Sequence, residues 1–160
     1  MKNALIILAG GVGKRLNNSK KIPKQFIKID NINIIEYFLE NLDNKIFDII
    51  VIVSETKKRL KYLKETKKKF FNHKLYFTQS GNNRQLSSKK GLFFLKKFKP
   101  KKVLIHDAAR PLVNNNLIKK IIKNLDTCKV CAPFINQNDY IKYKKNNYEI
   151  NNYSLKYIQT

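Results

Sequence analysis

Residues 8–16 read LAGGVGKRL and directly follow the apolar run Ala4–Leu8, which has the composition of a buried β-strand. Three of the five glycines of the chain lie in this stretch. A strand that ends in a glycine-rich loop brings backbone amides to a place where a phosphate can approach without hindrance from a Cβ atom. The loop lacks the Gly-Lys-Ser/Thr ending of a Walker loop, and Leu16 stands where the dinucleotide fingerprint requires a third glycine. A plain structural turn therefore remains an alternative to a phosphate-binding loop.

The rest of the chain alternates between strand and helix patterns. The strands expected are Asn3–Leu8, Asp48–Val53, Lys74–Thr78, Lys102–His106 and Lys129–Phe134, and the helices expected are Ile34–Leu42, Thr56–Phe70, Gln85–Lys97 and Asn115–Leu125. The run DIIVIV is apolar throughout, as in a parallel strand that is covered on both faces. Such repetition predicts an α/β fold with a Rossmann-like, mostly parallel sheet, which binds ligands at the carboxyl ends of its strands.

The pattern changes after Asn136. Asp139–Tyr143 and Asn147–Tyr153 alternate between polar and apolar residues around KKNN, which predicts a polar β-hairpin arm over about residues 136–154. The terminal LKYIQT begins like another strand. Neither an internal repeat nor a linker is visible, so we expect a single domain over residues 1–160.

The formal net charge of +23 favours nucleic-acid binding at first sight. Only four of the 34 basic residues are arginines, however, and the lysines are spread through the expected helices, as on a solvated surface. A basic nucleic-acid-binding protein on a Rossmann-like scaffold remains the alternative from a different class, but we expect no nucleic-acid partner. The chain has no apolar run of membrane-spanning length and no signal peptide, so we expect a cytoplasmic protein without a membrane partner.

Cys128 and Cys131 form the spacing CKVC. Residues three apart on a strand point to opposite faces, so these two side chains would not chelate one ion together. We expect two buried free thiols rather than a zinc site.

Further loops carry groups suited to a nucleotide. The segment Pro23–Phe26 (PKQF) adds the positive charge of Lys24 downstream of Arg15, and together they suit a polyphosphate under attack. The segment Ser80–Ser87 (SGNNRQLS) precedes a helix and offers small polar side chains for a base edge and a ribose. These loops favour nucleotide chemistry over passive dinucleotide binding.

The segment Leu104–Pro111 (LIHDAARP) ends an expected strand at Asp107. A carboxylate at the end of a strand can hold Mg²⁺ together with the phosphates of a substrate. A helix cap or an ion pair with Arg110 is the alternative. The loops contain three of the four arginines, whose guanidinium groups form two hydrogen bonds to phosphate where an ammonium group cannot: Arg15, Arg84 and Arg110.

The motifs LAGGVGKRL, PKQF, SGNNRQLS and HDAARP, in this order and spacing, resemble the 2-C-methyl-D-erythritol 4-phosphate cytidylyltransferase family of the non-mevalonate isoprenoid pathway. HDAARP together with PKQF is specific, whereas the glycine loop is shared with many nucleotidyltransferases. The resemblance runs from residue 4 to the terminal QT, which is similar to the start of the family's QTPQ. It implies a fold of the nucleotide-diphospho-sugar transferase type, CTP and methylerythritol phosphate as substrates, Mg²⁺ as cofactor, diphosphate release, and a homodimer formed through the hairpin arm.

The resemblance also implies roles for single residues. It makes Arg15 and Lys24 catalytic and Asp107 the metal ligand. The residues implied in nucleotide binding are Ala9, Gly10, Gly11, Gly13, Gly81, Asn82, Arg84, Ser87 and Ala108. Those implied in acceptor binding are Arg110, Tyr140, Lys142, Asn152 and Thr160. A phosphate monoester is already an anionic nucleophile, so these groups need only align the reactants and neutralise developing charge.

Departures from the family pattern fall in the arm and at the end of the chain. Tyr140 stands where the family has a threonine, and Asn152 stands where it has an arginine that binds the acceptor phosphate; Lys142 or Lys156 can substitute only as a point charge. The sequence also ends at Thr160, before the family's last strand and helix. We therefore expect a C-terminally incomplete relative that binds CTP and turns over slowly. A CTP-binding relative with little or no activity and a ribitol-phosphate cytidylyltransferase are the alternatives.

Overall fold

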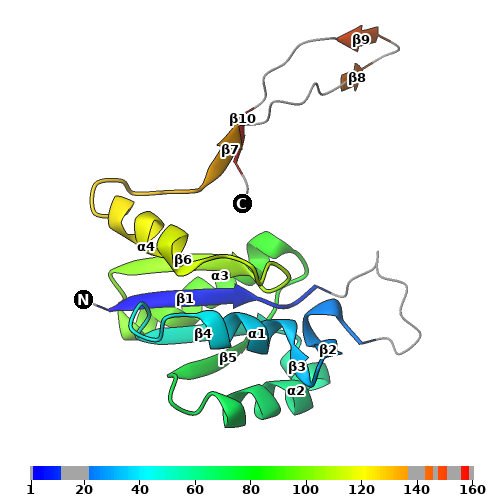
Figure 1. Ribbon diagram of the computed structural model, residues 1–160, viewed down its shortest axis with the longest axis vertical. Coiled ribbons are helices and arrows are strands. Elements are labelled where there is room, and N and C mark those ends of the chain that lie inside the picture. The colour runs from blue at the N-terminus through cyan, green and yellow to red at the C-terminus, as the bar shows by residue number, and fades with distance from the viewer. Residues whose placement is uncertain (1, 12–21, 137–142, 146–147, 151–155, 159–160) are drawn as a thin grey trace. The chain divides into compact units, whose positions relative to one another are not determined.

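The computed structural model describes residues 2–11, 22–136, 143–145, 148–150 and 156–158 (Figure 1). The chain divides into two compact units, Met1–Lys119 and Lys120–Thr160, and each is described by itself. The helix α4 (Asn115–Asn124) runs across the boundary between them.

A four-stranded sheet forms the centre of the first unit. Its strands are β1 (Asn3–Leu8), β4 (Ile49–Ser54), β5 (Leu75–Gln79) and β6 (Lys102–Asp107). All neighbours are parallel and their order is β5-β4-β1-β6, which confirms the predicted parallel α/β fold. In chain order, β4 pairs with β1 and β5 pairs with β4, whereas β6 pairs with the opposite side of β1. The carboxyl ends of β1 and β6 therefore lie at a point where the strand order reverses, and Leu8 pairs there with Asp107.

Helices cover both faces of this sheet (Figure 1). The remaining elements of the unit are η1 (Lys24–Phe26), β2 (Lys28–Ile29), β3 (Ile32–Asn33), α1 (Ile34–Asn41), α2 (Thr56–Lys69), α3 (Arg84–Leu95) and η2 (Lys96–Phe98). Gly91 of α3 lies directly against Ile6 of β1 and Val53 of β4. The helix α3 therefore packs on the face of the sheet to which these two side chains point. Phe38 of α1 stacks on His106 at 4.6 Å between ring centroids, on the opposite face. The first unit is thus built in three layers around β1 and β4, whose apolar residues are buried.

The antiparallel pair β2–β3 turns at Asp30 and Asn31, which both have positive φ, as in the primed turns of tight hairpins. Asn33 then caps α1: its side chain accepts from the backbone of Glu36, whose side chain accepts in return from the backbone of Asn33.

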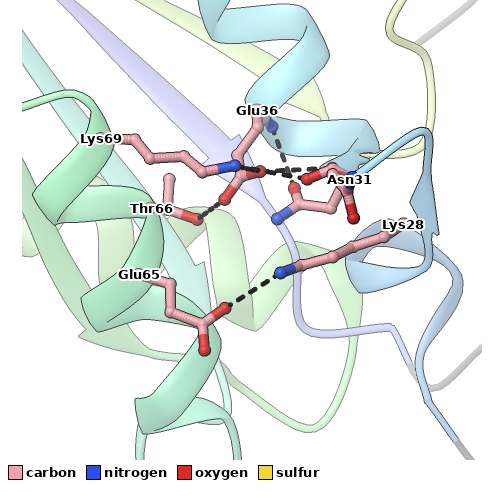
Figure 2. Close-up of polar contacts among 7 residues, drawn as sticks. Lys28, Asn31, Glu36, Glu65, Thr66 and Lys69 are labelled. Carbon is pink, nitrogen blue, oxygen red and sulfur yellow. Dashed lines mark hydrogen bonds and ion pairs between the residues drawn. The ribbon is translucent and has the colours of Figure 1, made fainter.

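The fully buried carboxylate of Glu36 joins α1 to α2, as Figure 2 shows. It accepts a hydrogen bond from Thr66 Oγ1 at 3.2 Å and from Lys69 Nζ at 2.8 Å, both on α2. Lys28 of β2 also pairs with Glu65 of α2, at 3.4 Å. These contacts hold the segment that follows Lys24 against α2.

In the second unit, β7 (Phe134–Asn136) pairs antiparallel with β10 (Lys156–Ile158), and β8 (Tyr143–Lys145) pairs antiparallel with β9 (Tyr148–Ile150). The predicted hairpin is therefore present, although Lys144 and Lys145 belong to its strand rather than to the turn expected at KKNN.

The strand predicted over Lys129–Phe134 was wrong, because residues 129–133 are not in a strand and β7 begins at Phe134. Pro133 explains the late start, since proline cannot donate to a strand ladder and restricts the residue before it. Outside a strand, the expected burial of the thiols was wrong as well: Cys128 is exposed and Cys131 partly exposed, both as free cysteines. Over the described part of the chain, no helix combines the length and the apolar character needed to cross a membrane.

Candidate functional site

A cleft of about 470 Å³ lies in the first unit at the carboxyl ends of β1 and β6. Its walls come from the loop after β1, the turn η1, the start of α3 and the loop after β6. The lining residues are Leu8, Gly10, Gly11, Lys24, Gln25, Gly81, Asn82, Asn83, Arg84, Ser87, Asp107, Ala108, Ala109 and Arg110. Three of these side chains are cationic and one is anionic, so the cleft suits an anionic ligand.

The glycines of the cleft serve two different purposes. A Cβ atom on Gly10 would lie 2.6 Å from Ser80 Cβ, and one on Gly81 would lie 2.4 Å from Leu86 Cβ. Gly10 is therefore required by close packing between the loop after β1 and the segment before α3, and Gly81 by close packing of that segment on the first turn of α3. A Cβ on Gly11 would meet no atom of the described residues within 4 Å. Gly11 lines the cleft and, among these residues, leaves open the space that a side chain would fill, as a phosphate-binding loop requires.

The turn η1 places Lys24 at the edge of the cleft, directly before two anchored residues. Phe26 is buried and its ring stacks on Tyr62 of α2 at 5.1 Å. Gln25 is buried on the other side of the turn, where its Nε2 donates to the carbonyl oxygens of Ala9 and Gly11. The exposed ammonium group of Lys24 is therefore carried by a backbone that both the core and the glycine loop hold in place.

The amino terminus of α3 opens into the cleft. Asn83 caps the helix, because its side chain accepts from the backbone N–H of Leu86 at 2.8 Å. Ser87 Oγ donates to the carbonyl of Asn83 at 2.8 Å and accepts from the backbone N–H of Gly81 at 3.0 Å. This network fixes the loop over the first turn of α3, where the positive end of the helix dipole favours anions.

Asp107 is the single acidic residue among the lining residues, and both of its carboxylate oxygens are engaged. Arg84 Nε lies 3.1 Å from one oxygen and Arg110 Nε lies 3.5 Å from the other. The ion pair with Arg110 that the sequence left open is thus present, and a second pair with Arg84 joins it. The carboxylate is partly exposed, with 24% of its side-chain surface accessible to solvent.

A metal ion at this place would depend on the ligand as well as on the protein. Among the described residues, no group of three or more His, Cys, Asp or Glu side chains could hold a metal ion. Mg²⁺ needs no such cage, since it is usually held by one or two carboxylates together with water and substrate phosphates. The single carboxylate of Asp107 at the edge of an anion-binding cleft fits that pattern.

His106 braces the loop after β6 from behind. Its Nε2 lies 2.9 Å from the carbonyl oxygen of Arg110, a contact in which the ring N–H donates. Burial lowers the pKa of His106 below its usual value, although the hydrogen bond to Arg110 opposes this shift. The imidazole therefore stays neutral at physiological pH while it holds the turn between Asp107 and Arg110.

Most of the candidate residues that the structure describes meet in this cleft. The cleft is lined by Gly10, Gly11, Lys24, Gly81, Asn82, Arg84, Ser87, Asp107, Ala108 and Arg110. Ala9 is buried and takes part through its carbonyl oxygen, which accepts from Gln25 and from Ser54 Oγ. The candidates outside the described residues are Gly13, Arg15, Tyr140, Lys142, Asn152 and Thr160.

Sequence reasoning missed the parts played by Gln25 and Asn83. The signal for Asn83 was its place directly before an expected helix, which is typical of a capping residue. The only sequence signal for Gln25 was its place in PKQF. Its burial could not be foreseen, because glutamine side chains are mostly exposed.

Comparison with known proteins identifies the family of this chain. Residues 3–154 match the family model described as IspD: 2-C-methyl-D-erythritol 4-phosphate cytidylyltransferase. The chain is 34% identical over 122 residues to the protein of that name from Thermotoga neapolitana, covering 76% of this chain and 53% of the relative. It is 34% identical over 146 residues to the one from Caldicellulosiruptor bescii, covering 89% of this chain and 62% of the relative. The chain thus spans little more than half the length of these curated relatives.

A solved structure shares the fold. The 4-diphosphocytidyl-2C-methyl-D-erythritol synthase from Anaerococcus prevotii superimposes with a TM-score of 0.77 at 23% identity, over 99% of this chain and 68% of that one. Because the family model covers nearly the whole sequence and two relatives exceed 30% identity, the chain belongs to the 2-C-methyl-D-erythritol 4-phosphate cytidylyltransferase family.

Proposed function

We propose that this chain transfers the cytidylyl group of CTP to 2-C-methyl-D-erythritol 4-phosphate and releases diphosphate, a step in isoprenoid precursor biosynthesis. The observation that carries the proposal is the cleft itself. It combines an open backbone at Gly11, the amino terminus of α3, and the cations Lys24, Arg84 and Arg110 around one carboxylate. Membership of the cytidylyltransferase family supplies the identity of the two substrates.

The reaction needs no general base, because the acceptor phosphate is already an anion. One of its oxygens attacks the α-phosphorus of CTP and forms a new P–O bond. The bond from the α-phosphorus to the oxygen that bridges to the β-phosphorus breaks, and diphosphate leaves with the electron pair. The protein must therefore align the two phosphates and neutralise the charge that builds on the oxygens of the transition state.

We assign the neutralising charge to Lys24 and Arg15, and the binding of the triphosphate to the glycine loop and the start of α3. Gly81, Asn82, Ser87 and Ala108 would face the base and ribose. Mg²⁺, when it is held by Asp107 and the phosphates, supplies further positive charge against the triphosphate. Arg84 and Arg110 are close enough to Asp107 to turn toward phosphate once a ligand arrives.

We assign the acceptor to Arg110, to Tyr140, Lys142 and Asn152 of the arm, and to Thr160. A homodimer formed through the arm, where β8 and β9 make an antiparallel pair, is part of the proposal. Sedimentation of the protein at several concentrations tests it. Both substrates are dissolved metabolites, in keeping with a cytoplasmic location.

The proposed activity is tested by diphosphate release from CTP and Mg²⁺ with no acceptor, with 2-C-methyl-D-erythritol 4-phosphate, or with ribitol 5-phosphate. We expect release only with an acceptor and fastest with the methylerythritol compound. The variant Lys24→Ala should lower kcat more than it raises KM, because its charge serves the transition state. Lys64→Ala, which removes an exposed lysine of α2, is the matched control. A protein that releases no diphosphate with either acceptor would refute the proposal, and faster release with ribitol 5-phosphate would reassign the acceptor.

A further inference from the structure

The side chain of Gln25 forms a bridge between the turn η1 and the glycine loop. Gln25 is only 3% exposed although it belongs to a short turn at the protein surface. Its Nε2 lies 2.6 Å from the carbonyl oxygen of Ala9 and 2.9 Å from that of Gly11. One amide group thus uses both of its hydrogens on two carbonyls that flank Gly10.

These two carbonyls lie in the part of the loop that has left the sheet. The pairing of β1 with its neighbours ends at Leu8. Beyond it, Ala9 still donates its N–H to Val53, and its carbonyl also accepts from Ser54 Oγ at 3.2 Å. The contact between Gln25 and Gly11 lies farther out, at the residue whose backbone faces the open cleft. Gln25 therefore sets the direction of the carbonyl groups of Ala9 and Gly11.

The same residue is covalently joined to Lys24, which lines the cleft. Phe26 prevents the turn from moving away, because its ring is buried and stacked on Tyr62. A shift of the glycine loop relative to η1 would therefore break both hydrogen bonds of Gln25. The bridge fixes the glycine loop relative to the backbone that carries Lys24, whose ammonium group would neutralise the phosphate.

We propose that Gln25 is a positioning residue that locks the glycine loop and Lys24 into one unit for binding the triphosphate of a nucleotide. This inference rests on the proposed function. Gln25 touches no reacting atom in this role; it acts through Gly11 and Lys24. An apolar residue of the same size would remove the donor to both carbonyls, so burial alone does not account for a glutamine at this position.

The variant Gln25→Glu tests the bridge with almost no change in shape. At neutral pH it replaces the donating amide with a carboxylate that faces two carbonyl oxygens, so the loop and the turn must separate. A misplacement of about 1 Å can cost on the order of a hundredfold in rate, and we expect kcat/KM for CTP to fall by about that factor. Burial raises the pKa of such a carboxyl group, and its protonated form can donate again. The deficit relative to the unaltered protein should therefore shrink as the pH is lowered from 8 to 6.

Gln79→Glu is the matched control, since Gln79 uses its Oε1 as an acceptor from the N–H and Oγ1 of Thr56. A carboxylate can keep both bonds, so this variant should retain the activity and the pH profile of the unaltered protein. If Gln25 had a merely structural role, Gln25→Glu would lower the melting temperature, and kcat would not recover as the pH is lowered. If Gln25→Glu does not fold, Gln25→Asn keeps the amide but is too short for both carbonyls, and the same fall in kcat/KM is expected.

Hydrogen exchange separates this inference from the proposed function. In Gln25→Glu, but not in Gln79→Glu, the backbone amides of residues 9–11 should exchange faster at pH 8. They should also lose the protection that CTP with Mg²⁺ gives them. If the unaltered protein binds CTP but releases no diphosphate, the proposed function fails while this measurement still decides the bridge. Rates within about twofold of the unaltered protein at every pH, together with unchanged exchange of the loop, would overturn the role of Gln25.

Discussion

Two adjacent glycines give opposite predictions for one and the same substitution. Alanine at Gly10 would place its Cβ 2.6 Å from Ser80 Cβ and 3.1 Å from Ser80 Oγ, whereas alanine at Gly11 would meet no atom within 4 Å in the part of the chain that the structure describes. Neither glycine adopts a positive φ, so the alanine backbone is allowed at both positions. Gly10→Ala should therefore damage the fold, and Gly11→Ala should damage only the binding of a ligand.

The sizes of the two effects follow from these distances. Overpacking by one methyl group costs about 1–3 kcal/mol of unfolding free energy. In a chain of this length, about 1 kcal/mol lowers the melting temperature by roughly 2–4 °C, so Gly10→Ala should lose about 2–12 °C. Gly11→Ala should stay within about 0.5 kcal/mol of the unaltered protein. Its methyl group would instead keep a phosphate from one backbone N–H, and one lost hydrogen bond to a charged group, about 1.5–3 kcal/mol, weakens binding about ten- to a hundredfold.

Melting curves and calorimetric titration with CTP and Mg²⁺ measure the two effects separately. Gly91→Ala is a further control, because its Cβ would lie 2.9 Å from Ile6 in the core and away from the cleft. It should lower the melting temperature and leave the affinity of the folded protein unchanged. Tight CTP binding by a well-folded Gly11→Ala protein would refute the argument that the backbone of Gly11 faces the phosphates.

Three further predictions concern charge. Asp107→Asn should lose the Mg²⁺-dependent part of CTP binding in calorimetry and keep its melting temperature within a few degrees; a large loss of stability with binding intact would make Asp107 a structural residue. Glu36→Gln should lower the unfolding free energy by about 1–2 kcal/mol in urea titration, because it removes the charged partner of Lys69, and an unchanged midpoint would contradict this. Burial lowers the pKa of His73, so the unfolded chain binds a proton more readily than the folded protein does. The free energy of unfolding should therefore be highest above about pH 6.5 and should fall as the pH drops below that value. This fall should be shallower in His73→Gln.

Much of the fold follows from local patterns. The apolar runs at Ala4–Leu8 and Ile49–Val53 predict buried parallel strands, and the structure confirms them. The carboxyl ends of such strands share one edge of the sheet, so Asp107 was expected near the glycine loop, and the register pairs it with Leu8. The strand expected over Lys129–Phe134 was wrong, because the prediction followed the β-propensity of this segment and did not allow for Pro133.

The contacts that shape the cleft were beyond local patterns. The pair between Arg84 and Asp107 spans 23 residues and depends on how the start of α3 meets the end of β6. The bridge from Gln25 to Gly11 depends in the same way on how a turn docks beside a strand. No periodicity encodes such pairs, because each partner sits in a segment whose local conformation is satisfied without the other.

Asp107 can serve both as an ion-pair partner of arginine and as a metal ligand, because the charges around it change when a nucleotide binds. Without a nucleotide, Arg84 and Arg110 would repel each other, and the carboxylate between them relieves that repulsion. The triphosphate offers the guanidinium group of Arg84 anionic oxygens in a geometry that it binds in pairs, and the acceptor phosphate offers the same to Arg110. Once the two arginines turn to these phosphates, the carboxylate is left to a cation that the phosphates also bind. Under the proposed function, the ion pair and the metal site are therefore successive states of one carboxylate, and the arginines keep the cleft ordered until its ligand arrives.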